Sequence, residues 1–416
     1  MDVITAANKE SALLTSLESN QVSDIYTYRL LANLPNGSRN IWSVSPNIPP
    51  SGSPHSKDVV FKLPRYGLLQ RAVIKTDMVT GAAGVTAWAG VDDKNIGERI
   101  FSDISLRAHS KVITSSSPQH IRCRIDNAPT EMSHTYAMLT QQFGATGTRS
   151  MGETASTITT YTPIILPFFE KTSNYLDLEF VDQLELACVV NTAAGMGLPI
   201  AGSALSSATF TLYLFFRNLS NEARRAYEAK NFSPERPLNM LIYDEYVEQF
   251  TLPISATTQN LTMTLNVPHC VFATHFYVAQ GVTGTTAAGA DWGPAIQINN
   301  YSVSFTGRTI LNSIPYEVQQ YDGASYGVCG DKVTVGGTIT KRNRFSQPSP
   351  VSIYWAESND RTYNSHAVAM SNINNPQLTI NCAANDYPGV VYVVHEFWKL
   401  MTISPDDGRI DVGMSL

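Results

Sequence analysis

Two short stretches, one in each half of the chain, share a pattern that decides the fold. Residues 104–113 read ISLRAHSKVI and residues 303–311 read VSFTGRTIL. In both, an alternating strand pattern is followed by a small residue and a basic residue, and then by a second apolar stretch. This pattern is typical of two antiparallel strands joined by a tight reversal. Its recurrence about 200 residues later indicates that the chain contains two copies of one β architecture.

Most of the remaining sequence also has the character of strands, because β-branched and aromatic residues cluster in short runs that end at Gly, Pro, Asn or Ser. In the first half we expect strands over residues 25–34, 68–79, 100–113, 161–169, 176–190 and 208–218. In the second half we expect them over residues 241–252, 261–278, 295–311, 334–340, 351–356, 366–369, 377–382 and 390–403. Many strands with few helices favour a sandwich or barrel over an α/β enzyme.

Three stretches have a helical pattern. Residues 6–18 carry a short leucine stripe that is too short to be stable alone, so we expect a terminal arm that needs a partner. Residues 129–142 begin with a proline at a plausible first-turn position. Residues 220–230 form a capped, charged helix in the middle of the chain, followed by a turn-rich segment. The sequence therefore predicts two similar β domains joined by a helix.

Composition restricts the functions that remain. The 416-residue chain is 43% hydrophobic and 15% charged, which is enough apolar content to bury at least one large core and excludes a disordered protein. Its 29 Lys and Arg residues against 35 Asp and Glu residues give a net charge of -6. A protein that grips nucleic acid by neutralising phosphates is normally basic. We therefore expect no direct sequence-specific binding of nucleic acid.

The cysteines and the N-terminus indicate a reducing compartment. The five cysteines, at positions 123, 188, 270, 329 and 382, are widely spaced and odd in number, so we interpret them as free thiols. The first residues, MDVITAANKE, lack the basic region and apolar core of a secretory signal. The longest uncharged tracts are rich in Thr, Ser, Asn, Gly and Pro, which a membrane-spanning helix disfavours. We expect synthesis in the cytosol, with no signal peptide and no transmembrane segment.

No arrangement of residues typical of catalysis is found. The His-x-His pair of a cupin metal site is missing, and His269 and His275 would lie about 20 Å apart along a strand, too far to share a metal. We interpret them as imidazoles at a sandwich edge, bonded to backbone or water. His395 and Glu396 are strand neighbours that point to opposite faces, and we take both as ordinary strand residues. We therefore predict no enzyme, and no catalytic residue, metal or cofactor.

Four stretches carry a resemblance to a known family. Residues 61–69, FKLPRYGLL, resemble an early apolar-x-x-Arg-x-Gly-Asp-Leu motif, with Leu68 where Asp is common. Residues 212–227 resemble a strand that runs into a Glu-Arg-Arg helix, and residues 241–249, LIYDEYVEQ, resemble the strand after that helix. Residues 371–378, SNINNPQL, resemble a late Asn-Asn-Pro loop, without the usual preceding Gly. In this order they resemble the double jelly-roll major capsid proteins of icosahedral double-stranded DNA viruses, including nucleocytoplasmic large DNA viruses and virophages and, more distantly, adenovirus hexon.

The resemblance implies an all-β fold of two tandem eight-stranded antiparallel jelly rolls joined by a short helix, with few helices in loops. We assign residues 1–20 to an N-terminal arm, 21–219 to the first roll, 220–237 to a helical linker and 238–416 to the second roll. Within the linker we expect Arg224 and Arg225, next to Glu222 and Glu228 at helical spacing, to fix the angle between the rolls.

The implied function is that of a major capsid protein in the virion. Trimers would form pseudo-hexagonal capsomers that contact neighbouring capsomers and minor or penton capsid proteins, and a contact with an internal membrane stays open. Two other classes also stay open. A tandem β-sandwich that binds receptors or carbohydrate, such as a viral spike or a lectin, would show a signal peptide, disulfides or clustered exposed aromatics. An enzyme on a β scaffold would show convergent histidines and carboxylates.

Overall fold

The structure is a computed structural model of the chain. It describes residues 38–47, 50, 52–80, 97–127, 143–144, 157–167, 176–179, 181, 183–193, 195–196, 205–219, 221, 224–225, 238–280, 295–315, 318, 332–335, 338–341, 350–355, 367–385, 388–404 and 408–412. The predicted helices over residues 6–18 and 129–142 and the predicted strand over residues 25–34 lie outside the described residues. Of the predicted central helix, Asn221, Arg224 and Arg225 are described, and they are helical.

The first half of the chain forms two antiparallel sheets, which together we call roll one. Sheet 1 has the order β1 (Ser38–Val44), β10 (Leu205–Asn218), β3 (Leu68–Thr80), β7 (Thr157–Pro163) and the short β6 (Phe143–Gly144), and the short β8 (Leu176–Asp177) also pairs with β3. Sheet 2 has the order β2 (Asp58–Lys62), β9 (Leu184–Val190), β4 (Phe101–Ala108) and β5 (Lys111–Ser116).

The second half forms two further sheets, which we call roll two. Sheet 3 has the order β11 (Leu238–Leu252), β22 (Gly389–Ile403) and β13 (Cys270–Gln280), and β13 also pairs with β19 (Val351–Tyr354), β14 (Ala295–Ile296) and β20 (Val368–Ala369). Sheet 4 has the order β12 (Gln259–Thr264), β21 (Gln377–Cys382), β15 (Ile298–Phe305) and β16 (Arg308–Pro315). β23 (Ile410–Val412) pairs with β22, and β17 (Lys332–Val335) with β18 (Thr338–Lys341) forms a separate hairpin.

The two rolls have the same topology. Eight strands of each roll are numbered along the chain: β1, β2, β3, β4, β5, β7, β9 and β10 in roll one, and β11, β12, β13, β15, β16, β19, β21 and β22 in roll two. Each roll then has one sheet of order 1-8-3-6 and one of order 2-7-4-5. The two stretches singled out in the sequence are the equivalent hairpins β4–β5 and β15–β16. His109 and Ser110 have φ of 48° and 67°, and Thr306 and Gly307 have φ of 53° and 74°. Positive φ at both central residues is the signature of a type I′ turn, so the predicted duplication and the predicted reversals are confirmed.

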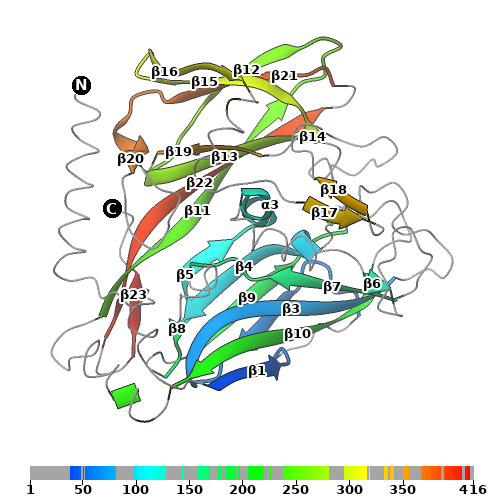
Figure 1. Ribbon diagram of the computed structural model, residues 1–416, viewed down its shortest axis with the longest axis vertical. Helices are drawn as coiled ribbons and strands as arrows, with labels where there is room; N and C mark the ends of the chain where they lie inside the picture. Colours follow the sequence, from blue (N-terminus) through cyan, green and yellow to red (C-terminus); the bar gives the residue numbers. More distant parts are fainter. Residues whose placement is uncertain are drawn as a thin grey trace.

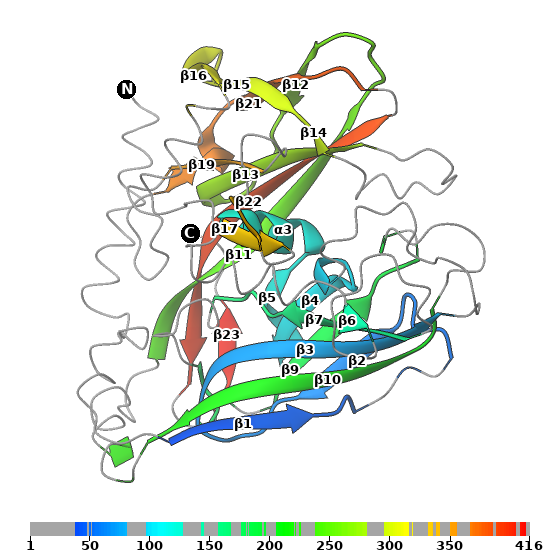
Figure 2. The same ribbon diagram turned by 45° about the vertical axis from the view of Figure 1, so that its right-hand side comes forward.

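The four sheets are stacked as layers, in the order sheet 1, sheet 2, sheet 3 and sheet 4. Sheets 1 and 2 enclose one core and sheets 3 and 4 another, and helix α3 (Pro118–Asn127) lies between β5 of sheet 2 and sheet 3 in two views 45° apart (Figures 1 and 2). The long strands β11 and β22, each of 15 residues, run from roll two down beside roll one (Figure 1). Face-to-face stacking therefore brings sheet 2 of one roll next to sheet 3 of the other.

Helix α3 was not predicted, although its start has a recognisable signal. Ser117 caps it by accepting a hydrogen bond from the backbone N–H of His120 at 3.2 Å, and Pro118 takes the first helical position. Ile121 packs into the core of roll one, whereas Cys123 packs against Tyr277 of sheet 3. Because both sides of the helix carry apolar residues, α3 fills the space between the rolls.

The core of roll one includes residues from the second half of the chain. Ile242, Met401, Ile403 and Ile410, from β11, β22 and β23, belong to the same buried cluster as the apolar residues of sheets 1 and 2. Roll two has its own separate core between sheets 3 and 4. The two rolls therefore share hydrophobic packing, which a division of the sequence at residue 238 does not convey.

Several predicted strands differ from the observed ones. The run predicted over residues 261–278 is two strands, β12 and β13, interrupted around Pro268, and the run over residues 176–190 is β8 and β9. β1 and β2 were not predicted, whereas β21 has the predicted bounds and β22 differs by one residue. Within the described residues, Cys123, Cys188, Cys270 and Cys382 are buried free thiols, as predicted, and Cys329 lies outside them. None of the described helices is both long enough and apolar enough to cross a membrane.

Candidate functional site

A cluster of buried ionisable groups joins the two rolls. We call it the junction, and its members come from both halves of the chain: His120 and Arg124 of α3, Glu245 of β11, His275 of β13 and Glu396 of β22. The side chains of His120, Arg124, Glu245 and Glu396 are between 0% and 6% exposed. The cluster is therefore inaccessible to solvent and lies between α3 and sheet 3.

Two carboxylates of the junction face each other across adjacent strands. Glu245 of β11 and Glu396 of β22 are direct partners in the strand register. Like charges at directly opposite positions destabilise a sheet, and burial increases that cost. The strand pair therefore depends on positive groups supplied by another part of the chain.

Helix α3 supplies those groups. Nδ1 of His120 lies 3.1 Å from Oε2 of Glu245, and Nε2 of His120 lies 2.9 Å from Oε1 of Glu396. Nε of Arg124 lies 3.6 Å from the same oxygen of Glu396. The backbone N–H of Ser117, just before the helix, donates to Glu245. Roll one thus neutralises two carboxylates that belong to roll two.

The electrostatics of the junction favour a bound proton. Burial raises the pKa of Glu245 to about 7, even though His120 and the hydrogen bond from Ser117 oppose the shift. Burial alone would lower the pKa of His120, but Glu245 and Glu396 outweigh it, and the pKa is raised. Both shifts follow from placing one imidazole between two carboxylates in a buried site.

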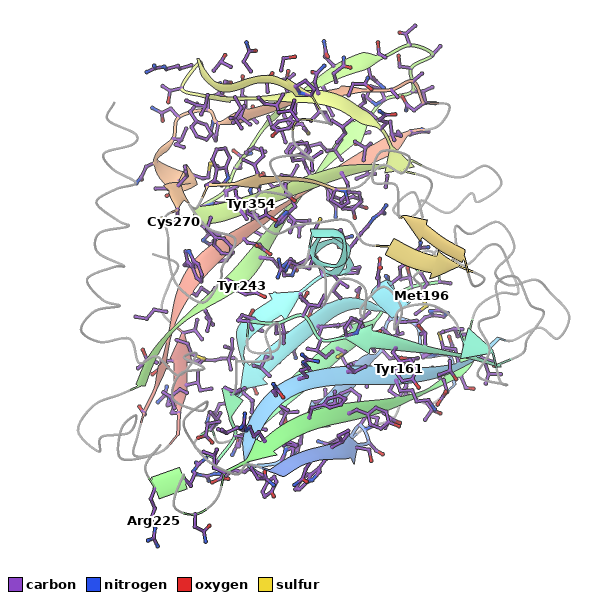
Figure 3. The ribbon with its side chains drawn as sticks, in the orientation of Figure 1. Tyr161, Met196, Arg225, Tyr243, Cys270 and Tyr354 are labelled. Carbon is purple, nitrogen blue, oxygen red and sulfur yellow. The ribbon has the colours of Figure 1, made fainter. Side chains whose placement is uncertain are left out.

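A second polar contact lies beside the junction, where β5 meets β11. Asp244 accepts a hydrogen bond from the backbone N–H of Ser115 at 3.0 Å and pairs with Lys399 of β22. The hydroxyl of Thr114 donates to the backbone oxygen of Tyr243 at 3.1 Å. Figure 3 labels Tyr243 and Tyr354 on the side of sheet 3 that faces roll one. The hydrogen bonds of Thr114 and Ser115 hold β5, the edge strand of sheet 2, against β11 of sheet 3.

The junction does not have the geometry of a metal or catalytic site. Nitrogen and carboxylate oxygen atoms 2.9 to 3.1 Å apart are at hydrogen-bond distance, and this leaves no space for a metal ion that needs about 2.1 Å to each ligand. Among the described residues, no three His, Cys, Asp or Glu side chains are arranged to hold a metal ion. The arrangement can hold the rolls together and can bind or release a proton.

A second ionic cluster joins the central helix to roll one. Arg224 pairs with Asp177 at 3.0 Å and with Glu179 at 3.2 Å. Glu179 in turn accepts a hydrogen bond from the backbone N–H of Gly67 at 3.0 Å, and its backbone oxygen accepts one from Arg65 at 2.9 Å. Two of the motifs quoted in the sequence, around residues 65–68 and around residue 224, therefore meet in space.

This contact revises the expectation for the central helix. Arg224 binds roll one through Asp177 and Glu179, whereas Arg225 is exposed and points away from the fold at the end of roll one (Figure 3). Burial raises the pKa of Asp177 to about 6, and Arg224 opposes the shift. These contacts of Arg224 anchor the helix to roll one, and α3 and β5 make ionic contacts between the rolls.

The outer face of sheet 4 is a regular array of uncharged polar side chains, which we call the polar grid. Its three rows follow the strand register across β12, β21 and β15: Asn260, Asn381 and Asn300; Thr262, Thr379 and Ser302; Thr264, Gln377 and Ser304. Hydrogen bonds link Asn381 to Asn260 at 2.7 Å and Thr262 to Thr379 at 3.0 Å. Leu378 and Ile380, on the other face of β21, are buried in the core. The grid therefore presents amides and hydroxyls to the outside.

The outer face of sheet 1, at the opposite end of the stack, has a different character. Ile41 of β1 is 60% exposed and lies opposite Phe215 of β10 in the register. Tyr161 of β7 lies opposite Lys75 of β3, which pairs with Asp77 at 2.8 Å. This face combines aromatic and aliphatic side chains with the Lys75–Asp77 ion pair and with Arg71, which lies opposite Phe215 in the register.

The interpretation of the histidines from sequence was wrong in part. His275 lies in the middle of β13, fully buried, with Nδ1 bonded to Ser352 Oγ at 2.7 Å and Nε2 3.5 Å from Glu396 Oε2, and so it is not at a sandwich edge. His269 precedes β13 and stacks on Phe397, with ring centroids 3.7 Å apart. His395 bonds to Thr274 and Glu248 on the opposite face from Glu396, as predicted. Glu396, however, is central to the junction and is not an ordinary strand residue.

The fold is that of known viral capsid proteins. PBCV-1 VP54, fitted into the virophage Sputnik, superposes with a TM-score of 0.64 at 13% identity, covering 92% of this chain and 98% of that one. The Faustovirus major capsid protein gives 0.59 at 8% identity, covering 88% and 90%, and the mavirus major capsid protein gives 0.57 at 11% identity, covering 92% and 93%. No family model and no curated protein matches the sequence. The predicted double jelly-roll fold is confirmed.

Proposed function

We propose that this chain is a major capsid protein, whose homotrimers form pseudo-hexagonal capsomers in an icosahedral viral shell. Its structural neighbours carry the names of capsid proteins, and they share its fold over nearly their whole length. No catalytic function is proposed: the ionisable groups of the junction are buried between the rolls, and those around Arg224 form ion pairs.

One observation carries the proposal: the two ends of the four-sheet stack expose different sheets, so the stack has a direction. Inside the chain, the 2-7-4-5 sheet of roll one lies towards the 1-8-3-6 sheet of roll two (Figure 1). The two ends of the stack expose the complementary types, a 1-8-3-6 sheet in roll one and a 2-7-4-5 sheet in roll two. A second copy can repeat the internal contact head to tail, with its sheet 1 against sheet 4 of the first.

Such a contact favours a closed ring. Head-to-tail contacts between different faces generate rings when the rotation closes. Three copies with two rolls each give six similar blocks around an axis, which accounts for a pseudo-hexagonal outline. The uncharged amides and hydroxyls of the polar grid and the aromatic side chains of sheet 1 suit such an interface, because interface centres are poor in charge and rich in aromatic residues.

The remaining assignments belong to the same proposal. We assign residues 1–20 to an arm, 21–219 and 238–416 to the rolls and 220–237 to the linker. Neighbouring capsomers and minor or penton capsid proteins are the proposed partners, with the virion as the location. The net charge of -6 supports a shell that leaves genome binding to other components.

The test combines mass in solution with imaging. Light scattering of the purified chain should give three times 45.6 kDa, and negative-stain images should show pseudo-hexagonal particles. The variant Thr379→Lys places a charge at the centre of the polar grid and should give a folded monomer. The control Thr257→Lys adds the same charge in an exposed loop and should remain trimeric. A wild-type chain that stays monomeric at micromolar concentration contradicts the proposal and favours the alternative of a tandem β-sandwich binding protein.

A further inference from the structure

Three members of the junction form a continuous contact across the two rolls. His120 of α3 lies between Glu245 and Glu396, which are opposite one another on β11 and β22. We call Glu245, His120 and Glu396 the trio. Because α3 belongs to roll one and both strands belong to roll two, any change in the trio acts directly on the contact between the rolls.

The distances within the trio require a proton. Nε2 of His120 is hydrogen-bonded to Glu396 at 2.9 Å, whereas the buried Oε2 of Glu245 has no hydrogen-bond partner and lies 3.1 Å from Nδ1. A protonated ring attracts that oxygen, and the lone pair of an unprotonated Nδ1 repels it. A neutral imidazole has a single N–H, so it can satisfy only one of the two contacts. The hydrogen bond of Nδ1 is made with Ser116 Oγ at 3.0 Å, which can bond the ring in either state, so the effect of the proton on Oε2 of Glu245 is electrostatic. The folded trio therefore holds one proton more than a neutral histidine with two carboxylates.

The groups around the trio do not supply that charge in another way. Arg124 brings one fixed positive charge against the two carboxylates. Asp244 is already paired with Lys399, and Asp103 of β4 is close enough to interact with Asp244. On β13, His275 approaches Glu396 from the side opposite His120, through its Nε2 at 3.5 Å.

Three further ionisable groups of these elements, Arg122, His395 and Glu248, make other contacts. Arg122 of α3 lies over the ring of Tyr277, 4.5 Å from its centroid. His395, with Glu248, lies on the other face of β22. With the extra proton, the trio and Arg124 sum to zero charge; without it, they sum to one buried negative charge, which is costly.

We propose that Glu245, His120 and Glu396 form a proton-operated latch between the two rolls, which holds α3 against sheet 3 while the proton is bound and loosens when the proton leaves. The latch lies within one chain, so it does not depend on the proposed capsid function. In an assembly, its opening would change the angle between the rolls of each subunit.

The direction of the pH effect follows from proton counting. In the unfolded chain, glutamates titrate near pH 4.3 and histidine near pH 6.5, so above about pH 6.5 the three separated groups keep no extra proton. The folded trio keeps one, which agrees with the raised pKa of His120 and with the pKa of about 7 for Glu245. Stability therefore falls as the pH rises: the raised pKa of Glu245 acts from about pH 4.3 to about 7, and the raised pKa of His120 acts above about pH 6.5. Each extra proton held by the folded trio gives a slope of about tenfold in the unfolding equilibrium constant per pH unit, or about 1.4 kcal/mol, until that proton is also lost.

The experiment uses the full-length chain and urea unfolding between pH 6.5 and 8.5. Glu245→Gln keeps the shape of the side chain without its charge, so the variant needs no extra proton and should lose the wild-type pH dependence in this range. His395→Gln is the matched control on the other face of β22. Burial lowers the pKa of His395, so its contribution changes only as the pH falls below about 6.5. The control should retain the wild-type slope above pH 6.5.

The latch is overturned if Glu245→Gln keeps the wild-type slope. Loss of the slope in His275→Gln at the same time would place the proton on β13. If Glu245→Gln does not fold, hydrogen exchange of the wild-type backbone amides tests the latch instead. After correction for the pH dependence of intrinsic exchange, protection in α3 should fall above neutral pH while that in β21 stays constant, and unchanged protection in α3 refutes the proposal.

Discussion

Sheet 2 of roll one and sheet 4 of roll two are the same sheet in topology but present different outer faces. In sheet 4 the positions that face outward form the uncharged polar grid. The equivalent positions of sheet 2, in the same register across β2, β9 and β4, are Asp58, Val189 and Asp103; Val60, Ala187 and Ser105; Lys62, Glu185 and Arg107. At the centre, Ala187 is 3% exposed whereas its counterpart Thr379 is half-buried.

The difference shows which features the fold imposes and which it leaves free. Both sheets need the inward positions to be apolar, and both have them, with Leu186 and Cys188 in β9 and Leu378 and Ile380 in β21. The outward positions depend on what covers them. Small residues at the centre of sheet 2 allow α3 and roll two to approach, and the charged residues lie around them. Sheet 4 has no covering element among the described residues, and it carries larger polar side chains.

The sharpest test of this comparison is the same substitution at the two equivalent central positions. Ala187→Lys forces a long charged side chain into a covered face and should lower the free energy of unfolding by roughly 3 to 5 kcal/mol. Thr379→Lys, on the open face, should cost at most about 1 kcal/mol within a single chain, for the lost hydroxyl contact with Thr262, so the comparison uses protein concentrations at which the chains are monomeric. Urea unfolding followed by tryptophan fluorescence measures both. Equal costs at the two positions would show that the outer face of sheet 4 is as covered as that of sheet 2.

A weaker effect is expected from removing one of the groups that hold roll two over sheet 2. Arg124→Ala leaves Glu396 with less compensation in a buried site and should destabilise the chain by about 3 kcal/mol. Arg225→Ala, at an exposed position, is the control and should leave the midpoint unchanged. A midpoint shift of the same size for both arginines would mean that the junction contributes nothing beyond a surface charge.

The smallest effect concerns the equivalent hairpins. Ser110 adopts a φ of 67° that glycine tolerates better, so Ser110→Gly should stabilise roll one by about 0.5 to 1 kcal/mol. Gly307 has a φ of 74°, and Gly307→Ser should destabilise roll two by about 1 kcal/mol even though nothing lies within 4 Å of the added Cβ. Thermal melting of the two variants measures these shifts. Effects of the same sign would contradict the shared type I′ geometry.

Parts of the fold that depend on local pattern could be predicted from the sequence. The alternation in residues 377–382 placed β21 correctly, and the repeat of residues 104–113 and 303–311 identified the equivalent hairpins. The helix α3 was missed, although Ser117 and Pro118 form a recognisable start, because the preceding β-branched run of β5 continued the strand pattern. β1 and β2 were missed although both contain β-branched and aromatic residues, because each run is short and lies in a stretch rich in Pro, Ser and Asn.

The junction could not be predicted from the sequence. His120 and Glu396 are 276 residues apart, and His275 lies between them on a third element. Strand alternation correctly placed His395 and Glu396 on opposite faces, but it contains no information about which roll lies beyond each face. Asp244 and Glu245 lay within a motif of the resemblance, and their contacts with Ser115 and His120 became visible only when the rolls were stacked.

The sequence by itself determined the periodicity of the strands, the turn chemistry of the two hairpins and hence the duplicated all-β architecture, because these depend on residues within a few positions of each other. Only the tertiary structure decided the direction of stacking, the shared core around Ile242 and Met401 and the pairing of Glu245 and Glu396 with His120. These features depend on which face of one sheet meets which part of another roll. That choice is made by the packing of α3 between the rolls, and no local pattern encodes it.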